Sequence, residues 1–409
     1  MSPQRLRATT PVAIAGQARK SLLSMFLLMG MVSMGWVPRI PEIKDAIGLT
    51  NGQFGFILLA STFGSVTGAQ LGGRAIHTFG SRRVTQVAIS IMPLGLAGMG
   101  LANSGLALVI SLFTMGFGYS LMDICLNAQG YTVERIIKKR CMSTLHAMWS
   151  VGAFLTTVIG GSVARFVSYE INLVAIAIFA AIAFIPAAFF LLPGDLDEHD
   201  GGEEETSAKI PLFGKSVLSL WGLGIGLFGC LIAEGAASDW AGILLRDDMG
   251  YGKGVNASGF ASFALAMIVS RLLGDWTLDR FGPANTVKYG AYLGGFGWGA
   301  AILIAVPLSD SHPLIALIII NFGFACAGYG MGPMFPAFIL AAGATPGVAP
   351  AVAIARVGVI GIAGFFFGPT ITGLISEVTS LPIALFFPII MLFLAGFLSR
   401  TIKTEKDRH

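Results

Sequence analysis

The feature that most constrains the fold is a succession of apolar stretches, each about 20 residues long, that occupies most of this 409-residue chain. A helix of that length crosses the hydrocarbon core of a bilayer. Only 12% of the residues are charged, against about 25% in a soluble domain, and the mean hydropathy is +0.77. Too few charged side chains are present to cover a water-soluble surface. The sequence therefore predicts an all-α membrane protein.

Hydropathy predicts twelve transmembrane helices. Their expected ranges are 21–38, 53–72, 84–102, 106–131, 142–164, 172–192, 216–241, 256–274, 286–307, 313–340, 350–375 and 382–400. A Gly-rich, acidic segment separates the sixth span from the seventh and has the composition of a flexible linker. We therefore expect an N-terminal six-helix bundle at 1–192, a cytosolic linker at 193–215 and a C-terminal six-helix bundle at 216–409.

The distribution of Lys and Arg predicts the orientation of the chain. With the N-terminus in the cytosol, cytosolic segments hold 19 of these residues, outer loops hold five, and two lie inside spans. The first apolar stretch is too long for the core of a cleavable signal peptide. The expected protein is a multi-pass protein of a bacterial inner membrane with both termini in the cytosol.

The two halves of the chain carry similar motifs. GGRAIHTFG begins at Gly72 and GDWTLDRFG at Gly274; each follows the second span of its half and ends in Phe-Gly. The tryptophans at 36 and 240 precede the glycines at 55 and 259 by the same nineteen residues. Parallel repeats related by an axis along the membrane normal are one known plan of transporters.

On these motifs the chain resembles the major facilitator superfamily, whose loop between the second and third helices has a Gly-x-x-x-Asp-Arg/Lys-x-Gly-Arg-Arg/Lys pattern. The N-terminal copy matches it at Gly73, Gly80 and Arg82, with His77 in place of the acidic residue. The resemblance implies twelve helices in two pseudo-symmetric bundles, and a transporter that works as a monomer by alternating access.

The C-terminal copy of the loop matches at Asp279, Arg280 and Gly282, with Asp275 where glycine is expected. The resemblance implies that both copies belong to a latch on the cytosolic side. The stretches WVPRIPEIKDAIGLT, STLHAMWSVG and EGAASDW are similar to the bacterial YbjJ-like branch of the superfamily, which is related to the fucose-permease-like transporters.

A carboxylate stands in an otherwise apolar region. No charged residue occurs between Arg83 and Asp123. The residues Tyr119, Asp123 and Asn127 are spaced by four and form a polar stripe on one helix face, which Tyr131 extends. A charge facing lipid costs about 2.5–3.5 kcal/mol at the bilayer centre, so the stripe is expected to face protein or water. The resemblance implies that this helix lines a central cavity.

Two roles are open for Asp123. Desolvation favours the uncharged form of a carboxyl group, so the residue is suited to take up a proton or to contact substrate. The alternative is a structural aspartate, paired with an arginine or held by hydroxyl groups. We favour the functional role because intramembrane carboxylates are functional by default.

Three further ionisable residues lie inside predicted spans. Glu234 is equally consistent with function and with structure. His146, at the level of Asn127, is a proton relay or, slightly favoured, a packing element. Arg356 either pairs with Asp123 or Glu234, or binds an anionic substrate.

Several other residues have polar or aromatic groups suited to a solute or to structure. Arg271 and Asp275, four residues apart, are expected to form a local ion pair. Possible substrate contacts are Trp36, Trp149, Asn321 and Tyr329. For Trp36 and Trp240 we favour anchoring at the outer membrane interface.

Other classes of function lack motifs. No GxxxxGK[ST] motif indicates ATP use, no nucleophile–base pair indicates an enzyme, and the four cysteines are too far apart for a metal site. We expect no cofactor and no metal. The net charge of +4 is spread over loops, which does not favour a nucleic-acid partner.

The sequence thus predicts a secondary transporter that moves a small polar solute, such as a sugar or sugar acid, by proton-coupled symport. One alternative is a proton-antiport exporter of amphipathic compounds or metabolites. Another is a transport-inert membrane sensor.

Overall fold

The computed structural model describes residues 11–139, 141–194, 196, 215–345, 348 and 350–402. Most of the predicted linker, residues 195 and 197–214, lies outside these ranges, and the side chain of Asp275 is likewise outside what is described. All the regular secondary structure among the described residues is helical, and these residues contain no strand. Each of the twelve predicted spans coincides with helix, and eleven helical segments among the described residues are long and apolar enough to cross a membrane.

The chain forms two compact units. Unit 1 comprises residues 1–35, 60–156 and 170–206, and unit 2 comprises 36–59, 157–169 and 207–409. Segments 36–59 and 157–169 thus belong to the unit that holds the C-terminal half of the sequence.

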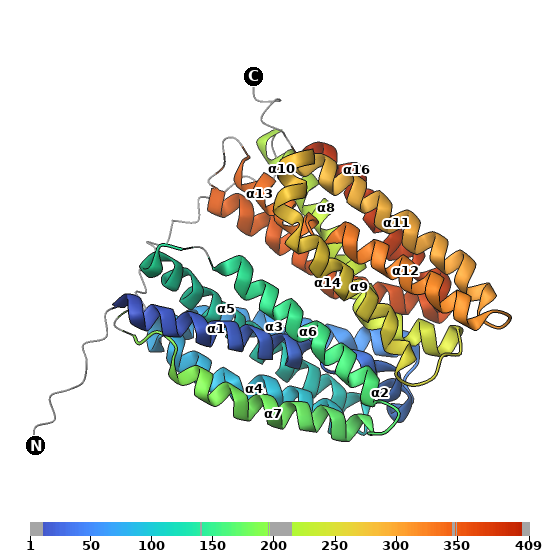
Figure 1. Cartoon of the computed structure of the whole chain (residues 1–409), viewed down its shortest axis with the longest axis horizontal. Coiled ribbons are helices and arrows are strands. Elements are labelled where there is room, and N and C mark those ends of the chain that lie inside the picture. Colours follow the sequence, from blue (N-terminus) through green and yellow to red (C-terminus); the bar gives the residue numbers. More distant parts are fainter. Residues whose placement is uncertain are drawn as a thin grey trace, which may run out of the picture. The chain divides into compact units, whose positions relative to one another are not determined.

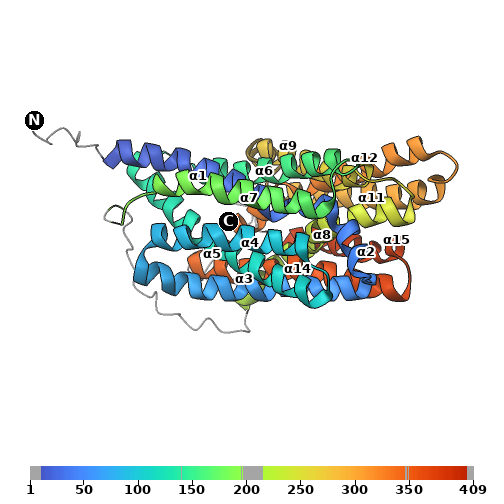
Figure 2. The same cartoon turned by 90° about the horizontal axis from the view of Figure 1, so that it is seen from below.

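Long helices make up unit 1. They are α1 (Pro11–Met34), α4 (Ser81–Leu101), α5 (Gly105–Ile137), α7 (Tyr169–Phe189), and most of α3 (Asn51–Phe79) and α6 (Met142–Val163). Helices α4 and α5 run side by side, and α7 lies along α4 in both views (Figures 1 and 2). Helices α1 and α6 touch backbone to backbone: a Cβ on Gly30 would lie 2.0 Å from the Trp149 carbonyl oxygen, and one on Gly152 2.0 Å from that of Leu27. Small residues permit this approach.

The C-terminal half dominates unit 2. Its helices are α8 (Lys215–Ile243), the π-helical turn η2 (Leu244–Asp248), η3 (Val255–Ala257), α9 (Ser258–Leu272), α10 (Gly274–Phe281), α11 (Pro283–Leu308), α12 (Pro313–Met331), α13 (Met334–Gly343), α14 (Pro350–Val378), α15 (Leu381–Ala384), α16 (Phe386–Leu398) and η4 (Ser399–Thr401). It also contains η1 (Val37–Arg39) and α2 (Ile40–Ile47). Helix α14 packs along α8, and α11 lies beside α12 (Figure 1).

The repeated motif ends in the same backbone turn in both units. Gly80 has φ 83° and ψ 147°, and Gly282 has φ 75° and ψ 156°, values that essentially only glycine adopts. In each turn the glycine N–H donates to the carbonyl four residues back, Ile76 or Leu278, and the next helix starts at once. The two copies of the motif therefore share a backbone conformation as well as sequence similarity.

Two expectations about helix continuity need adjustment. The range 313–340 holds two helices, because α12 ends at Met331 and Pro333, which has no N–H to donate, precedes α13. Helix α3 continues to Phe79, so most of the predicted loop at 72–83 is helical.

Candidate functional site

The polar stripe of α5 lies in unit 1. Tyr119, Asp123 and Asn127 are all half-buried, and Tyr131 is exposed. The Asn127 Nδ2 group donates to the Asp123 backbone carbonyl at 2.8 Å, which fixes the orientation of the amide. The side chains at 123 and 127 therefore stand on neighbouring turns of one helix face, as their spacing predicts.

His146 joins this stripe from α6. Its Nε2 atom lies 3.1 Å from Asn127 Oδ1, and because an amide oxygen only accepts, the hydrogen bond requires a proton on Nε2. The Phe26 ring of α1 meets the imidazole edge-on, with 5.1 Å between ring centroids. Sequence analysis placed His146 at the level of Asn127, and the hydrogen bond agrees with that placement. Asn127 thus connects the imidazole to the backbone carbonyl of Asp123.

A second ionisable pair lies in unit 2. Arg271 of α9 places Nη2 3.6 Å from Glu234 Oε1 of α8. The side chain of Glu234 is 18% exposed and that of Arg271 34% exposed, so both groups retain access to water. The Arg271–Asp275 pair remains a prediction, because the Asp275 side chain lies outside the described part of the chain.

The other candidate solute contacts of unit 2 differ in exposure and in how many hydrogen bonds they already make within the protein. Arg356 is half-buried in α14, and Tyr329 is 38% exposed on α12. The Asn321 amide is already used: Ser262 donates to its Oδ1 at 3.0 Å, and its Nδ2 donates to Ser258 and to the Leu317 carbonyl. In this structure Asn321 connects α12 to α9.

The tryptophans correct one expectation. Trp36 is 6% exposed and Trp240 is fully buried, with its indole N–H donating to the Pro369 carbonyl at 3.1 Å. Anchoring at a membrane interface needs an indole at the protein surface, so that expectation is wrong for both. Trp149 in unit 1 is half-buried, and its Nε1 atom finds no acceptor among the described residues.

The residues of the predicted latch lie around the two glycine turns. Gly73 and His77 belong to the last turns of α3, and Arg82 donates to the Phe189 carbonyl of α7 at 2.7 Å, within unit 1. Asp279 and Arg280 are exposed on α10, in unit 2. The backbone of Asp275 lies in the same helix.

Sequence analysis missed a fully buried glutamine. Gln129 of α5 donates to Ser81 Oγ at 2.7 Å and accepts from the Leu192 N–H at 2.8 Å. It joins the start of α4 to the chain after α7. Its position two residues after Asn127 places it on the other side of α5 from the stripe. The sequence did contain a signal for this residue, namely an amide side chain within a largely apolar helix.

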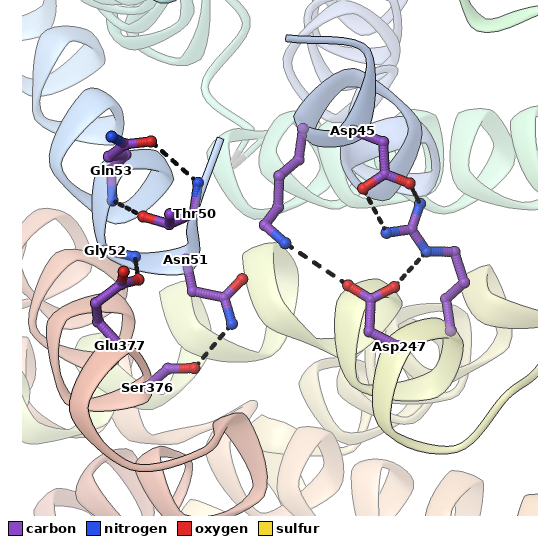
Figure 3. A network of polar contacts seen from close by, with 10 residues as sticks. Asp45, Thr50, Asn51, Gly52, Gln53, Asp247, Ser376 and Glu377 are labelled. Carbon is purple, nitrogen blue, oxygen red and sulfur yellow. Dashed lines mark hydrogen bonds and ion pairs between the residues drawn. The ribbon is translucent and has the colours of Figure 1, made fainter. Parts of the chain in front are cut away.

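A charged cluster at α2 was also missed. Arg246 contacts both carboxylate oxygens of Asp45, at 2.7 and 3.0 Å, and its Nε lies 2.5 Å from Asp247 Oδ1 (Figure 3). Lys44 Nζ is 3.7 Å from Asp247 Oδ2. The two residues of α2 are at least 201 positions from the two residues of η2, so no local spacing reveals the cluster. Among the residues described, no group of three His, Cys, Asp or Glu side chains is placed to hold a metal ion.

The family model and the similar proteins agree on one family. The model of the Major Facilitator Superfamily matches residues 22–346. An uncharacterized MFS-type transporter of Yersinia pestis is 29% identical over 363 residues, which cover 88% of this chain and 89% of that protein. The uncharacterized transporter y4wD of Sinorhizobium fredii is 27% identical over 380 residues, which cover 92% and 96%.

Solved structures share the fold. A D-xylose–proton symporter has a TM-score of 0.74 at 15% identity, with 96% of this chain and 99% of that chain covered. The nucleoside transporter NupG has a TM-score of 0.74 at 13% identity, with 95% and 100% covered. The fucose:proton symporter FucP of E. coli has a TM-score of 0.59 at 15% identity, with 94% and 98% covered. At these identities the likeness concerns the fold alone. Since the family model matches well over half of the chain, this multi-pass membrane protein belongs to the Major Facilitator Superfamily of transporters.

Proposed function

We propose that the protein is a proton-coupled symporter that carries a small polar organic solute, of the sugar or sugar-acid type, across a bacterial inner membrane by alternating access. In this proposal both termini are cytosolic, the chain works as a monomer, and the bundles at 1–192 and 216–409 are the moving bodies. It belongs to the YbjJ-like branch, on the motifs quoted above. Two of the structures that share its fold are named as sugar–proton symporters, which supports the proposal without deciding the substrate.

The observation that carries the proposal is the chain Asp123–Asn127–His146 in unit 1. It combines a carboxyl group and an imidazole, the two side chains best suited to exchange protons within a membrane. Asn127 fixes the relative position of their helices by contacting the Asp123 backbone and the imidazole. Protonation of Asp123 removes one negative charge from the stripe and so changes the free energy of exposing it to either side.

Each unit, taken by itself, contains polar groups suited to solute recognition. The Glu234–Arg271 pair and Tyr329 offer acceptors and donors of the kind that bind sugar hydroxyls. Arg356 would serve a carboxylate-bearing solute, because a guanidinium binds a carboxylate through two parallel hydrogen bonds. In unit 1 the Trp149 indole N–H is a further donor.

The test is solute-evoked proton movement. Purified protein is reconstituted in liposomes loaded with a pH-sensitive dye and exposed in turn to sugars, sugar acids, amino acids and amphipathic cations. Wild type is expected to acidify the lumen with a sugar or sugar acid. Asp123→Asn is expected to lose proton-driven accumulation while retaining solute exchange, since only the protonatable group is removed.

A matched control is Asp310→Asn, which changes an exposed carboxylate of the α11–α12 connection in the same way. It should transport like wild type. Unchanged accumulation by Asp123→Asn would reject the assignment. If wild type and Asp123→Asn both move protons, we would assign proton coupling to Glu234 or His146. Outward transport of amphipathic cations would favour an antiport exporter. If no solute of the panel evokes proton movement, the result would favour a membrane sensor.

A further inference from the structure

A cavity of about 620 Å³ opens on the surface of unit 2, between the start of α3 and the end of α14. Its volume lies within the range of small-molecule sites, about 300–1,000 Å³. Two of the helical segments long enough to cross a membrane have an end here, since one begins at Asn51 and the other ends at Val378. The cavity therefore lies where a bilayer changes from polar headgroups to hydrocarbon.

Two polar side chains at the edge of this cavity each have a group without a partner among the described residues. Glu377 accepts from the Gly52 N–H through Oε2 at 2.8 Å, which leaves its Oε1 available (Figure 3). Gln53 Oε1 accepts from the Thr50 N–H at 3.1 Å, and Thr50 Oγ1 accepts from the Gln53 N–H at 3.2 Å (Figure 3). This reciprocal cap of α3 uses only the oxygen of the Gln53 amide, so its Nε2 donors are available.

The deeper part of the cavity is apolar. Phe56 and Ile57 follow Gln53 by three and four residues, and Leu374 precedes Glu377 by three. At 1.5 Å per residue, these apolar residues lie about 4–6 Å further along their helices than the polar ones. Phe56 is 64% exposed and Leu374 48% exposed, as expected of apolar side chains that face lipid. The cavity thus has a polar edge and an apolar floor that is open to the bilayer.

We propose that this cavity binds a phospholipid whose headgroup carries a primary ammonium group, namely phosphatidylethanolamine. The ammonium donates to Glu377 Oε1, the phosphate accepts from Gln53 Nε2, and one acyl chain lies along Phe56, Ile57 and Leu374. The order of polar and apolar groups in the lipid matches their order in the cavity. With cytosolic termini, as proposed above, the site belongs to the outer leaflet. Lipid binding itself does not depend on the proposed transport.

The charges of the cavity select among ligands. An anionic headgroup such as phosphatidylglycerol brings no cation for Glu377 and adds a like charge. A calcium ion takes about six to eight oxygen ligands, and no group of three His, Cys, Asp or Glu side chains among the described residues could hold a metal ion. Phosphatidylcholine has the right charges, but its trimethylated nitrogen cannot donate a hydrogen bond. Preference for the primary ammonium over its trimethylated form is therefore the signature of this site.

The test is lipid binding to the full-length protein, measured by native mass spectrometry. Delipidated protein in detergent is titrated with phosphatidylethanolamine or with phosphatidylcholine of identical acyl chains, and the fraction that carries a first lipid is recorded. Wild type should bind phosphatidylethanolamine about three- to tenfold more tightly, as expected for one charge-assisted hydrogen bond at a partly exposed site. Equal affinities of wild type for the two lipids would overturn the proposal without recourse to any variant.

Two substitutions examine the two ends of the headgroup. Glu377→Gln retains an oxygen to accept from the Gly52 N–H but loses the charge, so it should bind the two lipids equally. Gln53→Glu retains the cap of α3, because glutamate also serves at this position, but it sets a negative charge against the phosphate. It should weaken the binding of both lipids about three- to tenfold. A preference retained by Glu377→Gln, or unchanged affinities in Gln53→Glu, would contradict the site.

Phe56→Ala examines the acyl chain. It should weaken both lipids about two- to fivefold and leave the preference unchanged, because it removes only apolar contact. Glycerophosphoethanolamine, which has the headgroup without acyl chains, should not displace the lipid at equal concentration. Displacement would assign the cavity to a water-soluble zwitterion and would overturn the lipid as its occupant.

Asp310→Asn is the matched control, since it removes the charge of another exposed carboxylate in the same unit. It should keep the preference of wild type, and loss of the preference in this variant would show that the effect is not specific to Glu377. Lipid binding is measured without any solute, so failure of this site and failure of the proposed proton coupling give different results.

Discussion

At the scale of single residues, Cys141 shows how burial controls reactivity. It lies between α5 and α6 and is 1% exposed, and the Glu134 carboxylate accepts from its backbone N–H. Burial raises the pKa of the Cys141 thiol above its usual range, and the charge of Glu134 raises it further, although Arg19 acts in the opposite direction. The thiolate, which is the nucleophile, is therefore scarce at neutral pH.

We expect iodoacetamide to modify Cys141 at least about tenfold more slowly in the native protein than after denaturation in detergent. Peptide mass spectrometry over a time course at pH 7 measures both rates. The native rate should rise with pH, because deprotonation supplies the nucleophile. An exposed cysteine introduced at Ala46 gives the reference rate, and equal rates at the two positions would contradict the prediction.

Gln129 carries the second prediction at this scale. Gln129→Leu removes the partner of the Ser81 hydroxyl and of the Leu192 N–H, and both lie in a buried environment. The expected loss is about 1–3 kcal/mol of unfolding free energy, the cost of leaving the buried Leu192 N–H without its acceptor. Thermal unfolding followed by tryptophan fluorescence should show a lower midpoint. Gln86→Leu, on the exposed face of α4, should change the midpoint little, and an unchanged midpoint for Gln129→Leu would show that water replaces the amide.

The sequence predicted some of these residues and not others, for a physical reason. That Asp123 and Asn127 share one helix face was predictable, because helical spacing defines a face within one element. His146 was placed at the right level by counting residues along two adjacent helices. The Glu234–Arg271 pair joins two different helices, and the contacts between Asp45 and Arg246 join elements 201 residues apart. Only packing decides such partners. Trp36 and Trp240 were misjudged because an indole in an outer turn is equally at home at a membrane surface and in a buried aromatic contact.

At the scale of helices, the contact of α1 with α6 depends on two glycines. Gly30→Ala would place a methyl group within 2.0 Å of the Trp149 carbonyl oxygen, so the helices must separate. We expect a loss of about 1–3 kcal/mol, typical of overpacking. Gly16→Ala in the same helix has nothing within 4 Å and should be neutral or stabilising. Thermal midpoints of the two variants compare them, and equal midpoints would show that α1 and α6 adjust without cost.

Helix positions were predictable, whereas helix ends were not. Hydropathy detects the apolar part of a helix, so 53–72 was recognised but the polar extension of α3 to Phe79 was not. The same limit applies to α5, which continues past 131 to Ile137. A break inside an apolar stretch, as between α12 and α13, leaves hydropathy unchanged and is indicated only by Pro333. Periodicity and composition thus locate the elements, and local backbone chemistry decides where they stop.

At the scale of the whole molecule, the charge asymmetry gives a topology that can be tested. A green fluorescent protein fused after His409 should be fluorescent in cells, because the C-terminus is proposed to be cytosolic. Alkaline phosphatase fused there should be inactive, since it requires export, whereas a fusion after Ser311 should be active. Inactive phosphatase at Ser311, or active phosphatase at the C-terminus, would reverse the proposed orientation.

The two glycine turns have a consequence for the history of the chain. Gly80 and Gly282 hold the same backbone shape, yet the residues around them differ: His77 stands where the other copy has Asp279, and Ser81 where it has Pro283. If one ancestral half was duplicated, its descendants kept the bend and changed the chemistry attached to it. Selection for this bend acts on the glycine alone, because other residues do not adopt its φ and ψ. The neighbouring residues can then change, so that each half acquires a different function.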